Sequence, residues 1–568
     1  MKRPGARVLA CALALSATVA AATVSPAGAD APVHTAATSV RGGAVPDHFV
    51  GLSIEWSLVE RYMNPTARPA FVNLLRNLHT GVLRIGGSSQ DQMPFDATAP
   101  NNNRVITPED LAYVRATLDA AGDGNDHGKP RWGAVLGTAM SPPTDTKPWV
   151  SPEHARNFIT QGVGPAFPGE AAKEVAGIEL GNEPDLSYGS NLDRYLGDLA
   201  TYADPAVTGP YPVIAPNTSE DILPWTTLAD PTAATRYFHS WPQILDTGAP
   251  LMKPRAGAFD AYASDHFYPL ARTCTNKPYR CPSTTTLLSD EHLASLDYEV
   301  YTHATKAAEH GLGYRLEETN TAANRGADGV SNVAASATYA LSLMFHTACP
   351  HPPDQPGANA ACTTGAEGVN FHNAEIRAFF SPEEGNAYYN AVDYDPTEAM
   401  GAPTAAPLYY AILLFARFAQ DTIGLHQADV TTVDAQERKP EAWQVETDSG
   451  EHRLFLINKA DHPVTVTVSA SGAAAEIDRM TPYDPDGNRT LDAPQVRIDG
   501  RQVAADGTWP GFRPAAVHTS GNHTTLTLSA GEAAVLTSPS RPREEAAADQ
   551  LSRSMRTTAT SSAKGPSV

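Results

Sequence analysis

Short apolar runs alternate with longer amphipathic segments between about residue 46 and residue 418. The short runs have the length of β-strands, and the longer segments repeat their apolar residues at the spacing of an α-helix. Eight strands with helices between them predict a (β/α)8 barrel, or TIM barrel, of the α/β class over residues 46–418. The expected strands are Val50–Trp56, Gly81–Gly86, Trp132–Gly137, Gly177–Gly181, Tyr211–Pro216, Phe259–His266, Tyr314–Glu318 and Gly368–His372.

The pattern changes after residue 418, where helical periodicity gives way to alternating apolar and polar residues between turn residues. Residues 419–540 are therefore predicted to form an all-β sandwich domain, with strands at His452–Asn458, Val464–Ser469, Thr524–Ser529 and Ala533–Thr537. Within the N-terminal segment 30–45, Ala36–Arg41 could add one more strand to it. Residues 541–568 have no apolar pattern, so this tail is expected to be disordered.

The first 29 residues are typical of a secretory signal. Lys2, Arg3 and Arg7 precede an apolar run from Val8 to Val24, and a small-residue cleavage site follows at Ala27–Ala29. A membrane anchor is the alternative, but the run is rich in Ala, Ser and Thr and ends at a cleavage-type tripeptide. We therefore expect a secreted protein that makes no membrane contact after cleavage.

Cysteine spacing agrees with export. Cys11 lies in the predicted signal, and the other four cysteines form two close pairs, Cys274 with Cys281 and Cys349 with Cys362. Three pairings are possible, and the two local ones lose the least entropy on loop closure. A zinc site is the alternative, but the spacing is not C-x-x-C and histidines flank only one pair. Two disulfides and no metal are predicted.

Charge excludes some classes of partner. The formal net charge of −22 would become −25 once the three basic residues of the signal are removed. Such a charge argues against nucleic acid, and against a polyanion held on a broad basic surface. No phosphate-binding Gly-rich loop, G-x-S-x-G or H-E-x-x-H motif occurs, so no organic cofactor is expected. The sequence leaves the oligomeric state open.

Two segments place a glutamate where an expected strand runs into a loop. Glu183 follows the strand Gly177–Gly181, and Glu318 ends the strand Tyr314–Glu318. The carboxyl ends of barrel strands meet at one opening, and two carboxyl groups there suffice to cleave a glycosidic bond. Asn182 could bind the sugar 2-hydroxyl. These residues predict a glycoside hydrolase acting on a small-molecule or oligosaccharide β-glycoside; a secreted carbohydrate-binding protein without catalysis is the alternative.

Four motifs in one order carry a resemblance to glycoside hydrolase family 79, the β-glucuronidase and heparanase group. They are Val82–Ser89, Leu180–Pro184, His266–Pro269 and Glu318–Asn320. Gly51–Trp56 is similar to the first strand of that family and Val503–Trp509 to part of its β-domain, so the resemblance covers roughly residues 36–540. It implies a retaining mechanism with Glu183 as acid/base and Glu318 as nucleophile.

Glu317 competes with Glu318 for the role of nucleophile. Neighbours on a strand point to opposite faces, so only one of them is expected to enter the barrel mouth. The resemblance places the nucleophile directly before Thr-Asn, which selects Glu318. Glu317 is then expected to point towards the helix layer.

Other polar residues at strand ends are candidates for supporting roles. Arg84 could orient the nucleophile or form a structural ion pair. Tyr268 could donate its hydroxyl to Glu318 and His266 could line the pocket, or both could serve barrel packing. Further candidates for binding sugar hydroxyls are Glu55, Ser88, Asp91, Asn370 and His372.

The loop after Glu318 bears on the choice of sugar. The family usually carries a tyrosine and glycines there that bind the carboxylate of a uronic acid, whereas this chain has Ala323 where the tyrosine is expected. Arg325 could supply a bidentate carboxylate contact instead. We expect an exo-acting β-glucuronidase, with a neutral β-glucoside or β-galactoside as the alternative substrate.

Overall fold

The computed structural model describes residues 43–122, 130–219, 241–252, 259–274, 280–352, 362–376, 385–397, 401–420, 422–434, 438–469, 475–517 and 523–538. The predicted signal, the segment Ala36–Arg41 and the predicted disordered tail lie outside these residues.

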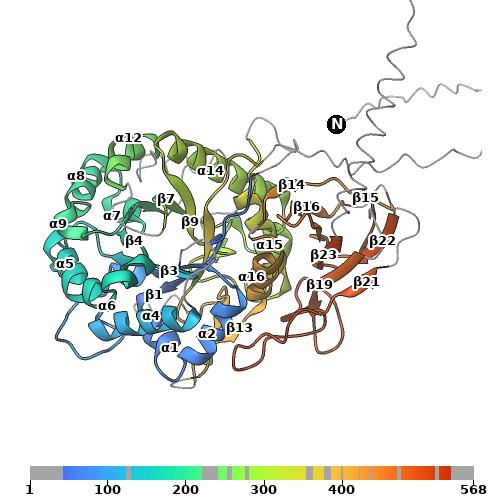
Figure 1. Cartoon of the computed structure of the whole chain (residues 1–568), viewed down its shortest axis with the longest axis horizontal. Coiled ribbons are helices and arrows are strands. Elements are labelled where there is room, and N and C mark those ends of the chain that lie inside the picture. The colour runs from blue at the N-terminus through green and yellow to red at the C-terminus, as the bar shows by residue number, and fades with distance from the viewer. Residues whose placement is uncertain are drawn as a thin grey trace, which may run out of the picture.

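A parallel sheet of nine strands forms the larger part of the molecule (Figure 1). Its strand order is β5-β4-β3-β2-β1-β11-β9-β7-β6. Only Ala215 separates β5 from β6, so the two short strands share the fifth position and close the sheet into the predicted (β/α)8 barrel. The strands are β1 (Val50–Glu55), β2 (Gly81–Gly86), β3 (Trp132–Thr138), β4 (Val175–Leu180), β5 (Val213–Ile214), β6 (Pro216–Thr218), β7 (Tyr262–Phe267), β9 (Gly313–Thr319) and β11 (Gly368–Asn373).

Helices cover the outside of the barrel, so its strands are buried on both faces and read as nearly continuous apolar runs. The helix α4 begins at a capping box, in which Thr107 and Asp110 each bond the backbone N–H of the other. The longer helices are α2 (Arg68–Asn77), α4 (Pro108–Ala121), α8 (Leu192–Tyr202), α12 (Trp241–Met252), α14 (Asp290–Glu309), α15 (Ala334–Ala348) and α16 (Pro407–Phe418).

Shorter elements lie in the loops between strands and helices. The short helices include α1 (Val59–Met63), α3 (Gly87–Gln90), α5 (Pro152–Asn157), α7 (Pro184–Tyr188), α9 (Pro205–Thr208) and α13 (Thr284–Leu287). Two small sheets are formed by β8 (Leu270–Ala271) with β10 (Ala322–Ala323), and by β12 (Val392–Asp393) with β13 (Thr404–Ala405).

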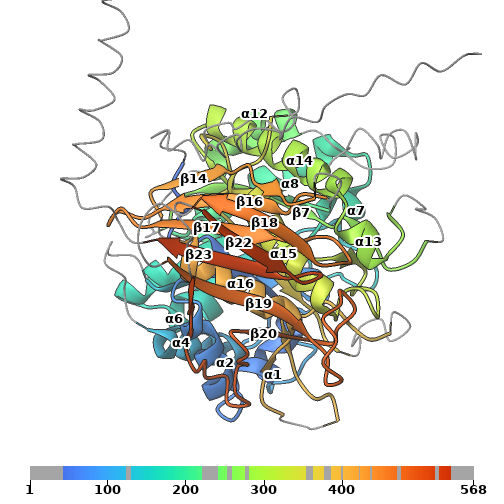
Figure 2. The same cartoon turned by 90° about the vertical axis from the view of Figure 1, so that its right-hand side faces the viewer.

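The C-terminal part consists of antiparallel sheets, as predicted, and lies beside the barrel (Figure 1); Figure 2 views the molecule from the side of these sheets. A seven-stranded sheet contains β14 (Gly424–Gln427), β16 (Glu441–Glu446), β17 (His452–Ile457), β19 (Ala475–Tyr483), β20 (Gln495–Ile498), β21 (Ala515–Val517) and β23 (Ala533–Ser538). A three-stranded sheet contains β15 (Thr431–Thr432), β18 (Val464–Ser469) and β22 (His523–Leu528).

Alternation along β17 decides how the two parts pack. Leu454 and Leu456 point into a core between the two β-sheets. Phe455 and Ile457, on the other face, join the core that continues into the barrel helices α15 and α16. In that core Phe345 of α15 stacks on Trp443 with ring centroids 5.3 Å apart. One continuous apolar core therefore joins the β-domain to the barrel.

Both predicted local disulfides are confirmed: Cys274 is bonded to Cys281, and Cys349 to Cys362. Within the described ranges, no helix combines the length and the apolar character needed to cross a membrane.

Candidate active site

Arg84 of β2 is fully buried, and each of its five N–H groups has an acceptor. Nε and Nη2 donate to the two carboxylate oxygens of Glu179, at 2.7 and 2.6 Å. Nη2 also donates to Oδ1 of Asn182 at 2.7 Å, and Nη1 donates to Oγ of Ser53 at 3.0 Å and to Oε2 of Glu318. Because Glu179 and Glu318 lie on β4 and β9, which do not neighbour β2, these bonds cross the interior of the barrel.

Glu183 occupies the turn between β4 and α7. Its backbone has φ 47° and ψ 58°, the left-handed region that non-glycine residues rarely adopt, and its N–H donates to the carbonyl of Asn217 at 3.0 Å. Pro184 directly after it is the first residue of α7. This turn brings Oε1 of Glu183 to 3.1 Å from Nδ1 of His266, at the end of β7.

Glu318 accepts hydrogen bonds from Arg84 and Tyr268 and has two histidines close to it. The Tyr268 hydroxyl donates to Oε1 at 2.8 Å, while Nδ1 of His372 and Nδ1 of His266 lie 3.5 and 4.0 Å from Oε2. Burial alone would raise the pKa of this carboxyl, but His372, His266 and Arg84 outweigh burial and hold the pKa far below its ordinary value. These surroundings therefore favour the ionised form of Glu318.

The two strand-end glutamates meet at one place. A carboxylate oxygen of Glu183, a carboxylate oxygen of Glu318 and a ring nitrogen of His266 all lie within 4.8 Å of one another. Burial lowers the pKa of His266, but the neighbouring carboxyls of Glu318 and Glu183 more than compensate and raise it. These three side chains could in principle ligate a metal, but the guanidinium of Arg84 already neutralises Glu318.

Glu317 does not point towards the helix layer, so that prediction was wrong. The pairing of β7 with β9 runs Asp265 to Leu316 and then His266 to Glu318, which leaves Glu317 as the extra residue of a β-bulge. A bulge interrupts strict alternation, so both glutamates point into the barrel. Oε1 of Glu317 accepts a hydrogen bond from the Tyr262 hydroxyl at 3.0 Å.

Glu55, Asp91 and His372 extend the polar lining around the two glutamates. His372 Nε2 lies 3.4 Å from Oε1 of Glu55, and the backbone N–H of Ser89 donates to Oε2 of Glu55 at 2.7 Å. The backbone N–H of Asn182 donates to Oδ2 of Asp91 at 3.4 Å. Burial raises the pKa of Asp91 to about 7.

The structure places three further sequence-predicted residues, Asn370, Arg325 and Ser88, in three different surroundings. Asn370 is buried in the barrel core, where its oxygen accepts from Nε of Arg315 at 2.7 Å. Arg325 is buried and pairs with Glu375, with Nη1 3.3 Å from Oε2. Ser88 is exposed on α3, whereas its neighbour Ser89 is the buried one.

Several residues of this site were not predicted. Ser53 and Glu179 bind Arg84, and both interrupt apolar strands at positions that point inwards, which is a signal that sequence inspection could have used. Tyr389 is buried with its ring centroid 6.2 Å from that of Tyr268, and Ala323 packs on the same cluster. Tyr389 comes from the loop after β11, where no periodic pattern predicts the direction of a side chain.

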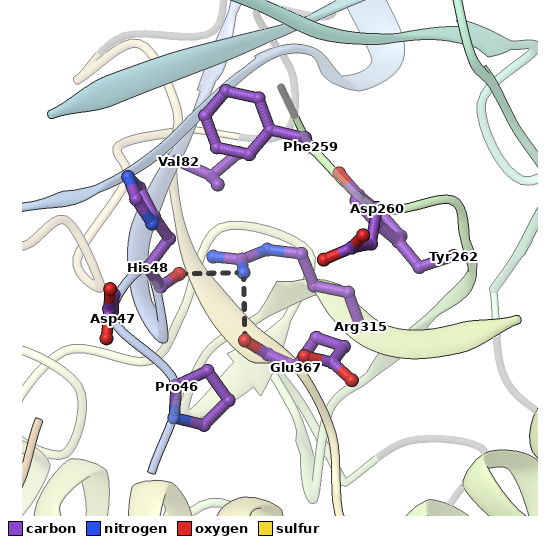
Figure 3. A pocket seen from close by; sticks show the side chains of 9 residues that line it. All are labelled: Pro46, Asp47, His48, Val82, Phe259, Asp260, Tyr262, Arg315 and Glu367. Atoms are coloured by element: carbon purple, nitrogen blue, oxygen red, sulfur yellow. Dashed lines mark hydrogen bonds between the residues drawn. The ribbon is translucent and has the colours of Figure 1, made fainter. Parts of the chain in front are cut away.

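A cavity of about 400 Å³ lies elsewhere, at the end of the barrel where the strands begin (Figure 3). Arg315 projects into it and donates to the carbonyl of His48 at 2.9 Å. Neither Glu183 nor Glu318 lines this cavity. Its lining is Pro46, Asp47, His48, Val82, Phe259, Asp260, Tyr262, Arg315 and Glu367.

Solved structures with the same architecture are glycosidases. A 4-O-α-L-rhamnosyl-β-D-glucuronidase from Fusarium oxysporum 12S is 18% identical with a TM-score of 0.60, covering 88% of this chain and 98% of its own. The family 51 α-L-arabinofuranosidase AbfB from Bifidobacterium longum is 14% identical with a TM-score of 0.53, covering 88% and 97%. A thermostable family 51 α-L-arabinofuranosidase from Thermotoga petrophila RKU-1 is also 14% identical, with a TM-score of 0.50 and coverage of 88% and 98%.

These likenesses show that the chain shares its fold with TIM-barrel glycosidases. No protein-family model and no curated protein sequence matches the chain.

Proposed function

We propose that the protein is a secreted retaining β-glycosidase. The observation that carries the proposal is the meeting of Glu183 and Glu318, which place one carboxylate oxygen each within 4.8 Å of the other. Retaining glycosidases hold their two carboxyl groups about 5–5.5 Å apart, whereas inverting enzymes need about 6.5–9.5 Å for an intervening water. The two disulfides support export, because disulfides persist in oxidising compartments.

The surroundings of Glu318 suit the role of nucleophile, which leaves the role of acid and base to Glu183. In the first step, the ionised Glu318 attacks the anomeric carbon while Glu183 gives a proton to the departing oxygen. In the second step, Glu183 takes a proton from water, and that water displaces Glu318 from the sugar. Arg84 and Tyr268 hold the attacking carboxylate in place through their hydrogen bonds.

His266 is suited to couple the two steps. Its Nδ1 lies 3.1 Å from Glu183 and 4.0 Å from Glu318, so one imidazole faces both carboxyl groups. The neighbouring carboxyls raise the pKa of His266, so a proton is held between the imidazole and Glu183 before the nucleophile attacks. Once Glu318 is esterified, its negative charge is gone and Glu183 can act as a base.

For the substrate we propose a small β-glucuronide, cleaved from its non-reducing end. The family resemblance supports this choice, and the Fusarium enzyme of the same fold is named for a β-D-glucuronide. Ala323 stands where the family has its tyrosine, and Ala323 packs against the cluster that contains Tyr389. Tyr389 could therefore take over the role of that tyrosine. Burial and Glu55 raise the pKa of Glu375, and a protonated Glu375 would leave the charge of Arg325 available to a sugar carboxylate.

A neutral β-glucoside or β-galactoside is the second candidate substrate. The ion pair of Arg325 with Glu375 favours it, because an arginine already neutralised by a buried partner attracts a uronic acid less. Side-by-side release assays on nitrophenyl β-glucuronide, β-glucoside and β-galactoside distinguish the two. Faster cleavage of glucoside than of glucuronide would exclude the uronic-acid substrate, and no release from any of the three would contradict glycosidase activity.

The stereochemistry of the product tests the mechanism independently of the substrate. Proton NMR during the first turnovers should show the β-anomer of the free sugar appearing before mutarotation. An α-anomer formed first from a β-glycoside would mean inversion and would rule out a covalent intermediate on Glu318.

A further inference from the structure

Glu317 is a buried carboxyl group for which the proposed mechanism has no role. Its side chain is fully buried, inside the barrel and one residue before Glu318. Tyr262 of β7 donates a hydrogen bond to Oε1, while Oε2 is buried and has no hydrogen-bond partner among the described residues. A carboxylate left in this state would be costly, because burial without pairing penalises the charged form.

The two nearby guanidinium groups make their hydrogen bonds elsewhere. Arg84 of β2 directs all five N–H groups to Glu179, Glu318, Ser53 and Asn182. Arg315 of β9 donates to Asn370 and to backbone carbonyls at the end of the barrel where the strands begin. Within the described residues neither arginine donates a hydrogen bond to Glu317, so both act on it through their charge alone.

Burial, together with the charge of Glu179, favours the neutral form of Glu317. Burial and the nearby Glu179 of β4 raise the pKa of Glu317 to about 7, against the opposing influence of Arg84 and Arg315. Tyr262 supplies the remaining polar contact. The raised pKa of Glu317 agrees with the geometry. Arg84 donates hydrogen bonds to the carboxyl groups of Glu179 and Glu318 but not to that of Glu317.

We infer that Glu317 is a positioning residue that must stay uncharged for Arg84 to hold the nucleophile Glu318. This inference rests on the glycosidase function proposed above. Arg84 already serves two carboxylates, Glu179 and Glu318. A third carboxylate at Glu317 would compete for the same guanidinium and loosen its hydrogen bond to Glu318. The ionisation of Glu317 would then set the alkaline limit of activity.

Glu317→Gln tests the inference, because glutamine has nearly the same shape and remains neutral at every pH. The dependence of kcat/KM on pH should keep its plateau within about tenfold of the wild type, and its alkaline limb should move upwards by about one pH unit or more. Glu317→Met, which is neutral but cannot accept from Tyr262, should shift the limb in the same direction from a lower plateau. Glu179→Gln is the matched control: it removes an ionised anchor of Arg84, so activity should fall at all pH values.

An unmoved alkaline limb in Glu317→Gln would overturn the inference, as would loss of activity at every pH in a folded variant. Failure of both neutral variants to fold, judged by circular dichroism, would mean that the barrel requires the charged form and would equally overturn it. The proposed function fails on a different result, namely a wild-type protein that releases no aryl group from any β-glycoside.

Discussion

Arg84 on β2 donates a hydrogen bond across the barrel interior to Glu318 on β9. The same guanidinium donates hydrogen bonds to both carboxylate oxygens of Glu179 on β4, and these two bonds fix the plane of the guanidinium. A bidentate carboxylate contact fixes the direction of an arginine in a way that a single bond does not. Glu179 therefore orients the group that in turn orients the candidate nucleophile.

Replacing the candidate nucleophile gives the first prediction. Glu318→Gln should lower kcat by more than about 10³-fold while leaving the thermal unfolding midpoint nearly unchanged, because an amide cannot form the glycosyl-enzyme bond. Glu317→Gln is the matched variant one residue away and should retain measurable turnover. The reverse pattern, an active Glu318→Gln and an inactive Glu317→Gln, would move the nucleophile to residue 317.

The second prediction concerns the shape of the cation at residue 84. Arg84→Lys keeps the positive charge but offers three donors on a point charge in place of five in a planar fork, so it cannot make all five hydrogen bonds to Glu179, Asn182, Ser53 and Glu318. We expect kcat to fall by about 10²-fold or more, with a smaller change in KM. Steady-state kinetics on an aryl glycoside would measure both. An unchanged kcat would mean that Arg84 is a structural ion pair alone.

Arg325 provides the third prediction, which bears on the choice of sugar. If its guanidinium binds the sugar carboxylate, Arg325→Ala should weaken glucuronide cleavage by about 2–5 kcal/mol of transition-state binding. Neutral glycosides should be affected far less. Glu375→Gln is the matched control, because it removes the charge that competes for Arg325 and should preserve or increase the preference for glucuronide. Equal losses on both substrate types in Arg325→Ala would contradict uronic-acid recognition by this residue.

The fourth prediction concerns stability at the junction with the β-domain. His346 of α15 lies between Asp297, with Nδ1 2.8 Å from Oδ1, and Glu441 of β16, with Nε2 3.5 Å from Oε1. Burial alone would lower the pKa of His346, but the two carboxylates outweigh it and raise the pKa to about 10, above the ordinary value of 6.5. Because the folded state binds this proton more tightly, its stabilising effect is complete below pH 6.5 and disappears as the pH rises to about 10.

The midpoint of thermal unfolding should therefore fall between pH 6.5 and pH 10. Deprotonation of His346 should lower the free energy of unfolding by a few kcal/mol at most. His346→Gln should have a lower midpoint at neutral pH and a flatter dependence on pH over the same range. His462→Gln is the control, because His462 is exposed and its ring pairs with its exposed neighbour Asp461. An identical slope in His346→Gln and the wild type would contradict the assignment.

The sequence by itself determined the features that depend on local periodicity. Strands such as Gly81–Gly86 and Gly368–Asn373 were predictable because buried parallel strands are apolar runs of limited length. The change of pattern after residue 418 predicted the antiparallel sheets, and close spacing predicted the two disulfides. The approach of Glu183 to Glu318 followed from topology, because barrel strands end at one opening.

Only the tertiary structure decided the direction of Glu317 and the partners of Arg84 and Arg325. A β-bulge arises from the pairing of β9 with its neighbours, so the sequence of β9 alone predicted alternation and the wrong face for Glu317. Arg84 binds residues that are 31 to 234 positions away, and Arg325 binds Glu375 in a loop without periodicity. Such pairings depend on which distant side chains share one buried volume, and no local pattern in the chain records that.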